Sequence, residues 1–144
     1  MSDFWESSLE PGYYDIVLHD GIKRGKGIQT NWHRETLLHC QKYIEKTHKH
    51  LDYACGPGTL IGKFSQADSI GVDLAEKQID YAKKKYSKKG LFLTTKEFEF
   101  NEYKETFDIV TMLGLIEFLT DDEIEALFKK IYTSLKPGGT LIIT

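Results

Sequence analysis

A glycine cluster follows a short apolar stretch near residue 55, and it restricts the fold more than any other part of the sequence. His50–Ala54 is predicted to be a short buried strand that ends at Gly56-Pro57-Gly58, and a helix is predicted from Thr59 to about Gln66. A glycine-rich turn between a strand and a helix lets a ligand approach the backbone closely, and it points the first N–H groups of the helix at any negative group there. The turn therefore predicts a ligand site at the end of this strand.

Strands and helices then alternate along the chain. Strands are predicted at residues 69–73, 91–95, 107–113 and 140–144, and helices at residues 75–86 and 120–135. Thr120, with Glu123 three residues later, forms a capping box for the last helix. This alternation is typical of an α/β fold, in which helices cover both faces of a parallel sheet and ligands bind beyond the carboxyl ends of the strands.

Composition fits one globular domain, because 40% of the 144 residues are apolar and the formal charge is −3. No apolar run approaches the roughly 20 residues that cross a membrane, and the first residues lack the pattern of a secretion signal, so a cytoplasmic protein is predicted. Two cysteines, Cys40 and Cys55, are too few for a disulfide framework or a four-cysteine zinc site. The histidine spacing suggests no metal site either.

Charge is distributed unevenly along the sequence. Residues 77–89 carry six lysines and one acid, whereas residues 97–125 carry ten acids and one base. Clustered lysines can contact the phosphates of a nucleic acid. Their place at the end of a predicted helix favours instead a solvated face that complements the helix dipole. The sequence thus argues against a nucleic-acid partner.

Asp73 ends the second predicted strand, seventeen residues after Gly56. A carboxylate there can accept both hydroxyl hydrogens of a ribose, or it can cap the next helix, and the neighbouring glycine turn favours the ribose. The glycines do not fit a dinucleotide site, because the third one would stand at Ile61 and Gly62 comes one residue late. A Walker A loop is excluded, since no Gly-Lys-Ser or Gly-Lys-Thr follows.

Four sequence blocks, in order, cover about residues 48–144. They are Asp52-Tyr53-Ala54-Cys55-Gly56-Pro57-Gly58, Gly71–Lys84, Phe107-Asp108-Ile109-Val110 and Leu135–Leu141. Together they resemble the class I S-adenosylmethionine-dependent methyltransferases. The resemblance implies a three-layer Rossmann-like sandwich, with a mostly parallel sheet in the order 3-2-1-4-5. It implies S-adenosyl-L-methionine as cofactor and S-adenosyl-L-homocysteine as product. Because the chain ends within its fifth strand, the last two strands of the seven-strand fold are expected to be lacking.

The resemblance assigns one group of residues to the methionine part of the cofactor. Ala54 and Gly56 would lie against it, with Asp52 beside it, and Met112 and Leu113 would offer backbone groups to its amino group. Ala54 stands where the family has its first glycine. An alanine is tolerated there if its φ angle stays negative.

A second group would hold the adenosine part. The resemblance implies that Asp73 binds the two ribose hydroxyls, that Leu74 packs on the adenine and that Gln78 lines the same side. The family often has an acid after the third strand that meets the adenine amino group. The best match to that acid in this chain is Glu97, with Phe98 next to it.

Two residues are candidates for a general base. Methyl transfer from a sulfonium is an in-line displacement, so a base is required only if the acceptor arrives protonated. Glu117 and His33 have side chains that can take a proton. Phe118 stands where the family has a polar residue, so a family histidine is absent there. His33 has an alternative role as a surface or capping residue near a helix start.

The N-terminal part differs from the rest. Residues 1–29 are aromatic without helical or strand periodicity, so they are predicted to be an extended segment, and residues 30–144 to be the cofactor-binding domain. Tyr14, Trp32 and Arg34 have two alternative roles. They either close over the cofactor as a lid, with aromatic faces toward its sulfonium and the guanidinium toward its carboxylate, or pack the flank of the sheet.

The sequence therefore predicts a methyltransferase acting on an unidentified acceptor, with a small molecule preferred. A noncatalytic binding module with the same fold is the alternative, because Ala54 and Phe118 depart from the family pattern. A nicotinamide-dependent oxidoreductase is disfavoured by the glycine spacing. The open edge of the fifth strand predicts a homodimer that forms through this strand.

Overall fold

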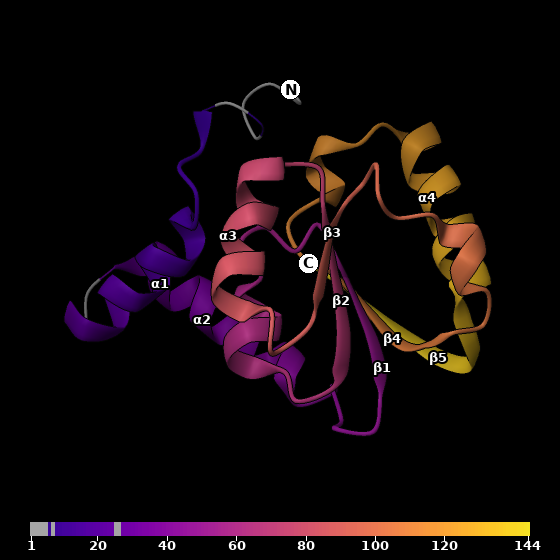
Figure 1. Ribbon diagram of the computed structural model, residues 1–144, viewed down its shortest axis with the longest axis horizontal. Helices are drawn as coiled ribbons and strands as arrows, with labels where there is room; N and C mark the ends of the chain where they lie inside the picture. Colours follow the sequence, from indigo (N-terminus) through magenta and orange to yellow (C-terminus); the bar gives the residue numbers. More distant parts are fainter. Residues whose placement is uncertain (1–5, 7, 25–26) are drawn as a thin grey trace.

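The computed structural model describes residue 6, residues 8–24 and residues 27–144, with only the backbone at residues 20–24. Phe4 and Trp5 of the N-terminal segment lie outside the described residues. One sheet separates α1, α2 and α3 on one side from α4 on the other (Figure 1). The helices are α1 (Tyr13–Arg24), α2 (Ile28–Gln41), α3 (Glu76–Tyr86) and α4 (Asp121–Ser134), and the strands are β1 (Lys49–Tyr53), β2 (Asp68–Asp73), β3 (Leu91–Thr94), β4 (Phe107–Met112) and β5 (Leu135–Ile143).

The five strands follow the order β3-β2-β1-β4-β5, and every neighbouring pair is parallel. The predicted α/β class and strand order are confirmed. β1 lies between β2 and β4, so the residues that follow these three strands meet at one edge of the sheet. This edge is where the sequence placed the ligand site.

Each face of the sheet has its own apolar core. On the side of α4, the buried members come from β1, β2, β4, α4 and the segment before β4, and they are Leu51, Ile70, Val72, Phe98, Phe107, Val110, Met112, Leu127 and Ile131. On the other side, α3 and the short π-helical segment Leu60–Phe64 pack on β2 and β3 through Cys55, Ile61, Ile79, Ala82, Tyr86 and Phe92. The strands are rich in buried residues because helices cover both faces.

The start of α4 follows from its first residues. The Thr120 hydroxyl accepts a hydrogen bond from the Glu123 N–H at 3.4 Å, and the Glu123 carboxylate accepts one from the Thr120 N–H at 2.8 Å. These two bonds form the predicted capping box. Three acids in the first turn complement the positive end of the helix dipole.

The described part of the N-terminal segment is largely helical, so the prediction of an extended segment was wrong. Residues 13–24 form α1, and α2 begins at Ile28. α1 forms because its inner face packs on the rest of the molecule, with Leu18 at 1% exposure. In the first turn of α1, Asp15 stands on the inner face, where an amphipathic helix normally has an apolar residue. This acid hides the helical periodicity in the sequence.

Asp15 fixes α1 to α3 and to the segment after the glycine turn. Its carboxylate is fully buried and accepts hydrogen bonds from the Tyr81 hydroxyl at 2.8 Å and the Tyr86 hydroxyl at 2.9 Å. Lys85 pairs with it directly, and the Lys63 ammonium lies 3.1 Å away. Burial by itself raises the pKa of Asp15, but the hydrogen bonds, led by that of Lys85, outweigh it and lower the pKa to about 2.

The fifth strand also differs from its prediction. It begins at Leu135, whereas the sequence predicted its start at residue 140. The pairing of β4 with β5 is irregular between Phe107 and Ile109. Phe107 lies opposite Leu135, but Ile109, two residues later, lies opposite Thr140, so β5 has extra residues between these two pairs. The extra residues are absorbed there as a bulge-like irregularity.

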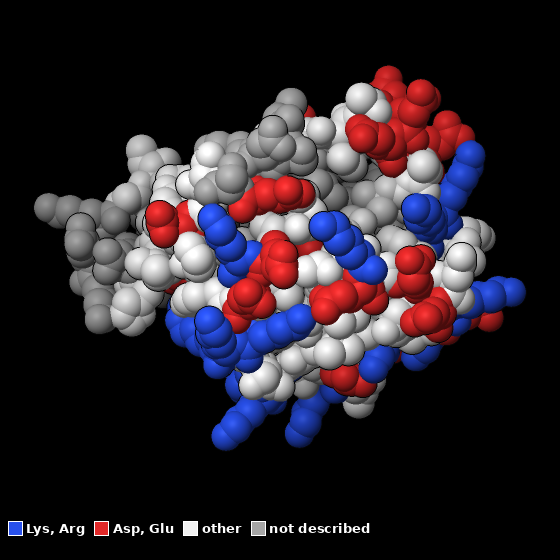
Figure 2. Space-filling view, turned by 45° about the horizontal axis from the view of Figure 1, so that its top comes forward, with Lys and Arg blue, Asp and Glu red and all other residues white. Residues whose placement is uncertain are grey.

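Charged side chains of both signs share the face shown in Figure 2, with a group of acids at the upper right. Two lysines of the basic stretch 77–89 pair with acids, Lys83 with Glu97 and Lys85 with Asp15. Within the described part of the chain, no helix has the length and apolar character needed to cross a membrane.

Candidate functional site

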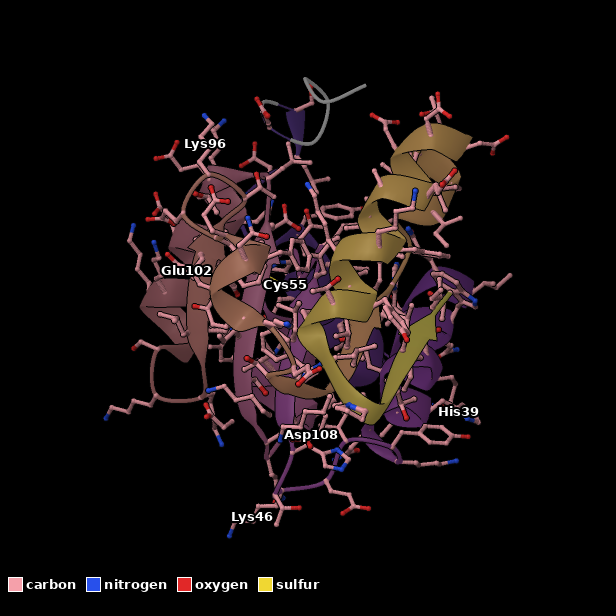
Figure 3. All side chains as sticks on the ribbon, turned by 90° about the vertical axis from the view of Figure 1, so that its right-hand side faces the viewer. His39, Lys46, Cys55, Lys96, Glu102 and Asp108 are labelled. Atoms are coloured by element: carbon pink, nitrogen blue, oxygen red, sulfur yellow. The ribbon has the colours of Figure 1, made fainter. Side chains whose placement is uncertain are left out.

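A cavity of about 330 Å³ opens at the carboxyl ends of β1, β2 and β4. The residues that follow these strands form its base, and residues from the N-terminal segment, α1 and α2 form the opposite wall. The residues that line it are Leu9, Tyr14, Leu18, Gln29, Trp32, His33, Thr36, Leu37, Asp52, Ala54, Cys55, Gly56, Pro57, Thr59, Leu60, Asp73, Leu74, Ala75, Gln78, Leu113, Gly114, Leu115, Glu117, Phe118 and Thr144. Figure 3 shows Cys55 of the glycine turn well above Asp108, which lies near the opposite ends of the strands.

The glycine turn is built from left-handed backbone. Ala54 has φ 66, Gly56 φ 52 and Gly58 φ 76. The condition for tolerating an alanine here, a negative φ, is therefore not met, and Ala54 adopts a conformation that costs an L-residue about 1–2 kcal/mol. Gly58 is required for space as well, because a Cβ there would lie 2.5 Å from the Phe92 ring. A Cβ on Gly56 would meet nothing within 4 Å, so this glycine borders open space.

Asp73 fixes the turn and the next helix together. One carboxylate oxygen accepts the Gly56 N–H at 2.8 Å, and the other accepts the Ala75 N–H at 2.9 Å. Burial raises the pKa of Asp73, whereas these backbone bonds act to lower it. Each carboxylate oxygen has two lone pairs, so the side chain that holds the loops keeps capacity for further donors from the cavity.

Asp52 lies at the base of the cavity and is 3% exposed. The Thr111 hydroxyl, on β4, donates to its Oδ1 at 2.7 Å. Burial raises the pKa of Asp52 to about 7; the hydrogen bond from Thr111 acts against this, and the charge of Asp73 adds to it. The two carboxyl groups predicted from the ends of neighbouring strands thus share one cavity.

Aromatic residues form the wall opposite the glycine turn. Tyr14 of α1 contacts His33 of α2 at a centroid distance of 5.1 Å, and Trp32 contacts the same ring at 4.9 Å. Burial lowers the pKa of His33, so its imidazole is neutral near pH 7. Burial also raises the pKa of Tyr14, which keeps its hydroxyl protonated. Glu117 lines the same cavity from the segment after β4.

Gln78 lines the cavity, but its amide is engaged by the N-terminal segment. Its Oε1 accepts the Gly12 N–H at 2.9 Å, and its Nε2 donates to the Glu10 carbonyl at 3.0 Å. The side chain that resemblance assigned to the cofactor thus also fastens residues 9–12 over α3. Leu74, beside it, and Leu113 line the cavity.

Four residues assigned to the cofactor do not line this cavity. Glu97 accepts the Thr94 N–H at 2.7 Å, which together with Lys83 lowers its pKa, and its side chain is exposed. Phe98 stacks on Tyr103 in the core on the α4 side. Met112 is buried in that core, and the Arg34 guanidinium pairs with Glu35 at 3.0 Å. Their role as cofactor ligands stays a prediction.

Sequence reasoning missed Leu9, Leu18 and Gln29, which line the cavity from the N-terminal part. One signal for Leu18 was available, because it stands four residues after Tyr14 and so shares its face of a helix. Leu9 and Gln29 carry no such pattern. They reach the cavity through the docking of α1 and α2.

The cavity residues fit a cofactor that carries a ribose and an amino acid group. Thr59 is 6% exposed and lines the cavity, and its buried hydroxyl has no hydrogen-bond partner among the described residues. A polar ligand group would satisfy it, since a buried hydroxyl without a partner is costly. The open space over Gly56 allows a ligand to contact backbone, and the spare lone pairs of Asp73 suit hydroxyl donors.

Comparison with known proteins defines the class. The family model described as a methyltransferase domain matches residues 51–139. Phosphoethanolamine N-methyltransferase 3 of Arabidopsis thaliana is 31% identical over 142 residues, which cover 91% of this chain and 27% of that protein. Malonyl-[acyl-carrier protein] O-methyltransferase of Priestia megaterium is 28% identical over 98 residues, which cover 65% of this chain and 35% of that protein.

A solved structure agrees with the fold. The TehB-like SAM-dependent methyltransferase from Corynebacterium glutamicum superimposes with a TM-score of 0.66 at 23% identity, over 90% of this chain and 69% of that one. The chain belongs to the methyltransferase domain family, in the class I fold that uses S-adenosylmethionine. It spans about a third of the length of the first two curated relatives given above.

Proposed function

We propose that this chain binds S-adenosyl-L-methionine in the cavity and transfers its methyl group to a small-molecule acceptor. The observation that carries the proposal is the pair Asp52 and Asp73, which lie at the ends of β1 and β2 beside the left-handed glycine turn. An acid at each of these places suits a cofactor that carries an ammonium group and a ribose. Bound there, S-adenosylmethionine supplies an electrophilic methyl group.

The residues of the chain position the reaction. Asp73 accepts hydrogen bonds from the ribose hydroxyls while it keeps the one from the Gly56 N–H, and Leu74 packs on the adenine. Asp52 faces the amino group of the methionine part. The Thr59 hydroxyl gains a partner in the polar end of that part. Orientation by such contacts accelerates an in-line displacement without a covalent enzyme intermediate, by up to roughly 7–11 kcal/mol in the best oriented systems.

His33 and Glu117 are the proposed bases. Both line the cavity, and the neutral imidazole of His33 can accept a proton from an acceptor that arrives protonated. The Tyr14 ring beside His33 restricts the orientation of the imidazole. His33→Gln is expected to lower methyl transfer to a protonated acceptor more than it weakens cofactor binding.

Calorimetry with S-adenosylhomocysteine tests the cofactor site. Asp73→Asn is expected to weaken binding at least tenfold, because a charge-assisted hydrogen bond contributes about 1.5–3 kcal/mol. Asp108→Asn is the matched control. The Asp108 carboxylate also accepts a hydrogen bond from a backbone N–H, that of Lys49 at 2.7 Å, but it lies outside the cavity. No binding by the unmodified chain at millimolar ligand would remove the proposal.

The N-terminal wall is proposed to be a lid over the cofactor, with Tyr14 and Trp32 facing it. Tyr14→Ala should then weaken S-adenosylhomocysteine binding. Tyr13→Ala is the control, because Tyr13 contacts the Tyr14 ring yet does not line the cavity. Equal affinities for the two variants would favour the alternative, in which these aromatics only pack the flank of the sheet.

A noncatalytic cofactor-binding module is the second candidate. Phe118, which lines the cavity and is 38% exposed, supports this candidate. Its apolar ring cannot take a proton from a methyl acceptor that enters there. A methyl-transfer assay with labelled cofactor across pools of amines, alcohols and thiols separates the two candidates. Binding without transfer to any pool would favour the module.

Partners and location are proposed more coarsely. The relatives are named for acceptors as different as phosphoethanolamine and malonyl-[acyl-carrier protein]. The proposal therefore names a small molecule as the class of acceptor and no particular compound. β5 lies at the edge of the sheet, and we propose that it pairs with β5 of a second copy. Light scattering tests the dimer. A cytoplasmic location stays a prediction of the sequence.

A further inference from the structure

A chain of buried polar side chains runs from the base of the cavity into the sheet. Asp52 Oδ1 accepts from the Thr111 hydroxyl at 2.7 Å, and that hydroxyl lies 2.9 Å from His50 Nε2. His50 Nδ1 lies 3.0 Å from the Ser69 hydroxyl, which is 3.2 Å from the Ser65 hydroxyl. None of the five is more than 7% exposed. The chain links β1, β4 and β2 on the face that α2 covers.

With Asp52 ionised, the chain has one complete pattern of hydrogens. Thr111 has a single hydroxyl hydrogen and gives it to Asp52, so His50 must donate to Thr111 from Nε2. His50 Nδ1 then accepts from Ser69, and Ser69 accepts from Ser65. Every member of the chain has a partner, and the His50 proton is on Nε2.

With Asp52 protonated, the same atoms form a second complete pattern. The Asp52 hydroxyl donates to Thr111, and Thr111 donates to His50 Nε2. His50 then donates from Nδ1 to Ser69, and Ser69 donates to the Ala67 carbonyl, 3.2 Å away. No heavy atom has to move. A polar chain that stays satisfied in both directions avoids the cost of a buried group without a partner.

We propose that His50 is a positioning residue for Asp52: by changing its tautomer it reverses the buried hydrogen-bond chain, which lets the cavity acid exist either as a carboxylate or as a carboxylic acid. The cationic group of a ligand selects the carboxylate. Asp52 then gives its proton to solvent through the cavity, while His50 releases its Nδ1 proton and takes up one at Nε2 by exchange with solvent, so that one proton is released in total. His50 is neutral before and after the step.

The charges around the chain support this assignment. Asp52 is faced by Asp73 from the end of β2, and by the thiols of Cys40 on α2 and Cys55 on the glycine turn. Burial, with repulsion from Asp73, raises the pKa of Asp52 to about 7, so both forms are populated near neutral pH.

Unlike Asp52, His50 does not change its charge near neutral pH. It is faced by His48, just before β1, which carries no negative charge to stabilise an imidazolium. Burial lowers the pKa of His50 to about 4, and the neighbouring His48 adds to this shift. Between pH 5 and pH 8, a change at His50 is therefore a change of tautomer and not of charge.

Nuclear magnetic resonance of the ligand-free chain tests the proposal. The ring ¹⁵N and ¹³Cδ2 signals of a histidine distinguish the two neutral tautomers from the imidazolium. His50 is expected to pass from the Nδ1–H to the Nε2–H tautomer as the pH rises, with a midpoint near pH 7, the pKa of Asp52. A single tautomer from pH 5 to pH 9, or formation of imidazolium in this range, overturns the proposal.

Asp52→Asn is the decisive variant. Its amide can donate to Thr111 or accept from it but does not titrate, so His50 should hold a single tautomer at every pH. A pH-dependent tautomer in this variant would overturn the proposal, because the change would then not originate at Asp52. Thr111→Val gives a second check, since it cuts the chain between the two groups, and His50 should no longer follow the titration of Asp52.

The ligand half of the proposal rests on the proposed function and has its own readout. Calorimetry of S-adenosylhomocysteine in two buffers of different ionisation heat should show release of about half a proton at pH 7, because Asp52 is half protonated there. The release should vanish for Asp52→Asn. If the ligand does not bind, the proposed function fails while the tautomer result stands. If it binds without this release, selection of the carboxylate is refuted.

Discussion

Replacement of Asp15 by Asn tests whether one buried carboxylate fastens the N-terminal wall of the cavity. The change keeps the size of the side chain and removes its charge. Two hydroxyls, of Tyr81 and Tyr86, and two ammonium groups, of Lys63 and Lys85, now converge on that charge. The amide left in its place can accept from only some of these donors.

The magnitude follows from the pKa of Asp15. The folded protein lowers it from 3.8 to about 2, and each pKa unit corresponds to 1.36 kcal/mol, so the charge contributes about 2.5 kcal/mol at neutral pH. Because the folded pKa is depressed, the contribution is complete above the unfolded value of 3.8 and is lost as the pH falls toward 2. At pH 3 it should be about half as large.

Urea unfolding and hydrogen exchange provide the assay. Asp15→Asn should lower the free energy of unfolding by about 2–3 kcal/mol at pH 7 and speed amide exchange in α1 by roughly 60-fold. Asp68→Asn is the matched control, because its ion pair with Lys49 is exposed and should contribute less than about 1 kcal/mol. Weaker cofactor binding is expected as well, since α1 carries Tyr14 into the cavity wall.

Two results would refute the reasoning. If Asp15→Asn and Asp68→Asn lose equal stability, the buried cluster does not fasten α1. If the deficit of Asp15→Asn stays constant between pH 7 and pH 3, it does not come from the charge of the carboxylate.

Three further substitutions test the local geometry. Ala54→Gly should raise the free energy of unfolding in urea by about 0.5–1 kcal/mol, because it relieves the left-handed strain at this position. The greater freedom of glycine in the unfolded chain offsets only part of this gain. A lower free energy of unfolding would contradict this prediction. Gly12→Ala should lose about 2 kcal/mol, since a Cβ would lie 2.3 Å from the Tyr81 ring at φ 74, and unchanged thermal unfolding would disprove it. Thr120→Ala should lose about 1 kcal/mol with its capping box, whereas the control Thr133→Ala, within the same helix, should be nearly neutral by circular dichroism melts.

Much of the site could be predicted because its signals are local. The strand that ends at the glycine turn, and Asp73 at the end of the next strand, are readable from short spacings and from the rule that ligands bind beyond the carboxyl ends of parallel strands. Gly56 and Asp73 are then brought together by the parallel pairing of β1 with β2. Glu97 was placed by resemblance alone, and its exposed side chain pairs with Lys83 of α3.

The N-terminal wall could not be predicted in the same way. The hydrogen bond that joins Gly12 to Gln78 spans 66 residues, and the bond that joins Tyr86 to Asp15 spans 71. A buried acid reads as a surface residue in a sequence, because its partners lie on elements whose approach is set only by folding. The same holds for His50, whose neighbours Ser69 and Thr111 come from two other strands.

The sequence by itself determined the α/β architecture, the order of its elements and the acid Asp73 at a strand end, because periodicity, glycine turns and strand-end positions act over a few residues. The tertiary structure decided that Ala54 is left-handed, that Gln78 holds the N-terminal segment and that Asp15 is buried among lysines and tyrosines. It also decided the buried hydrogen-bond chain beneath Asp52. These features depend on which distant side chains meet in a water-poor interior, where a hydrogen bond or a charge has large consequences.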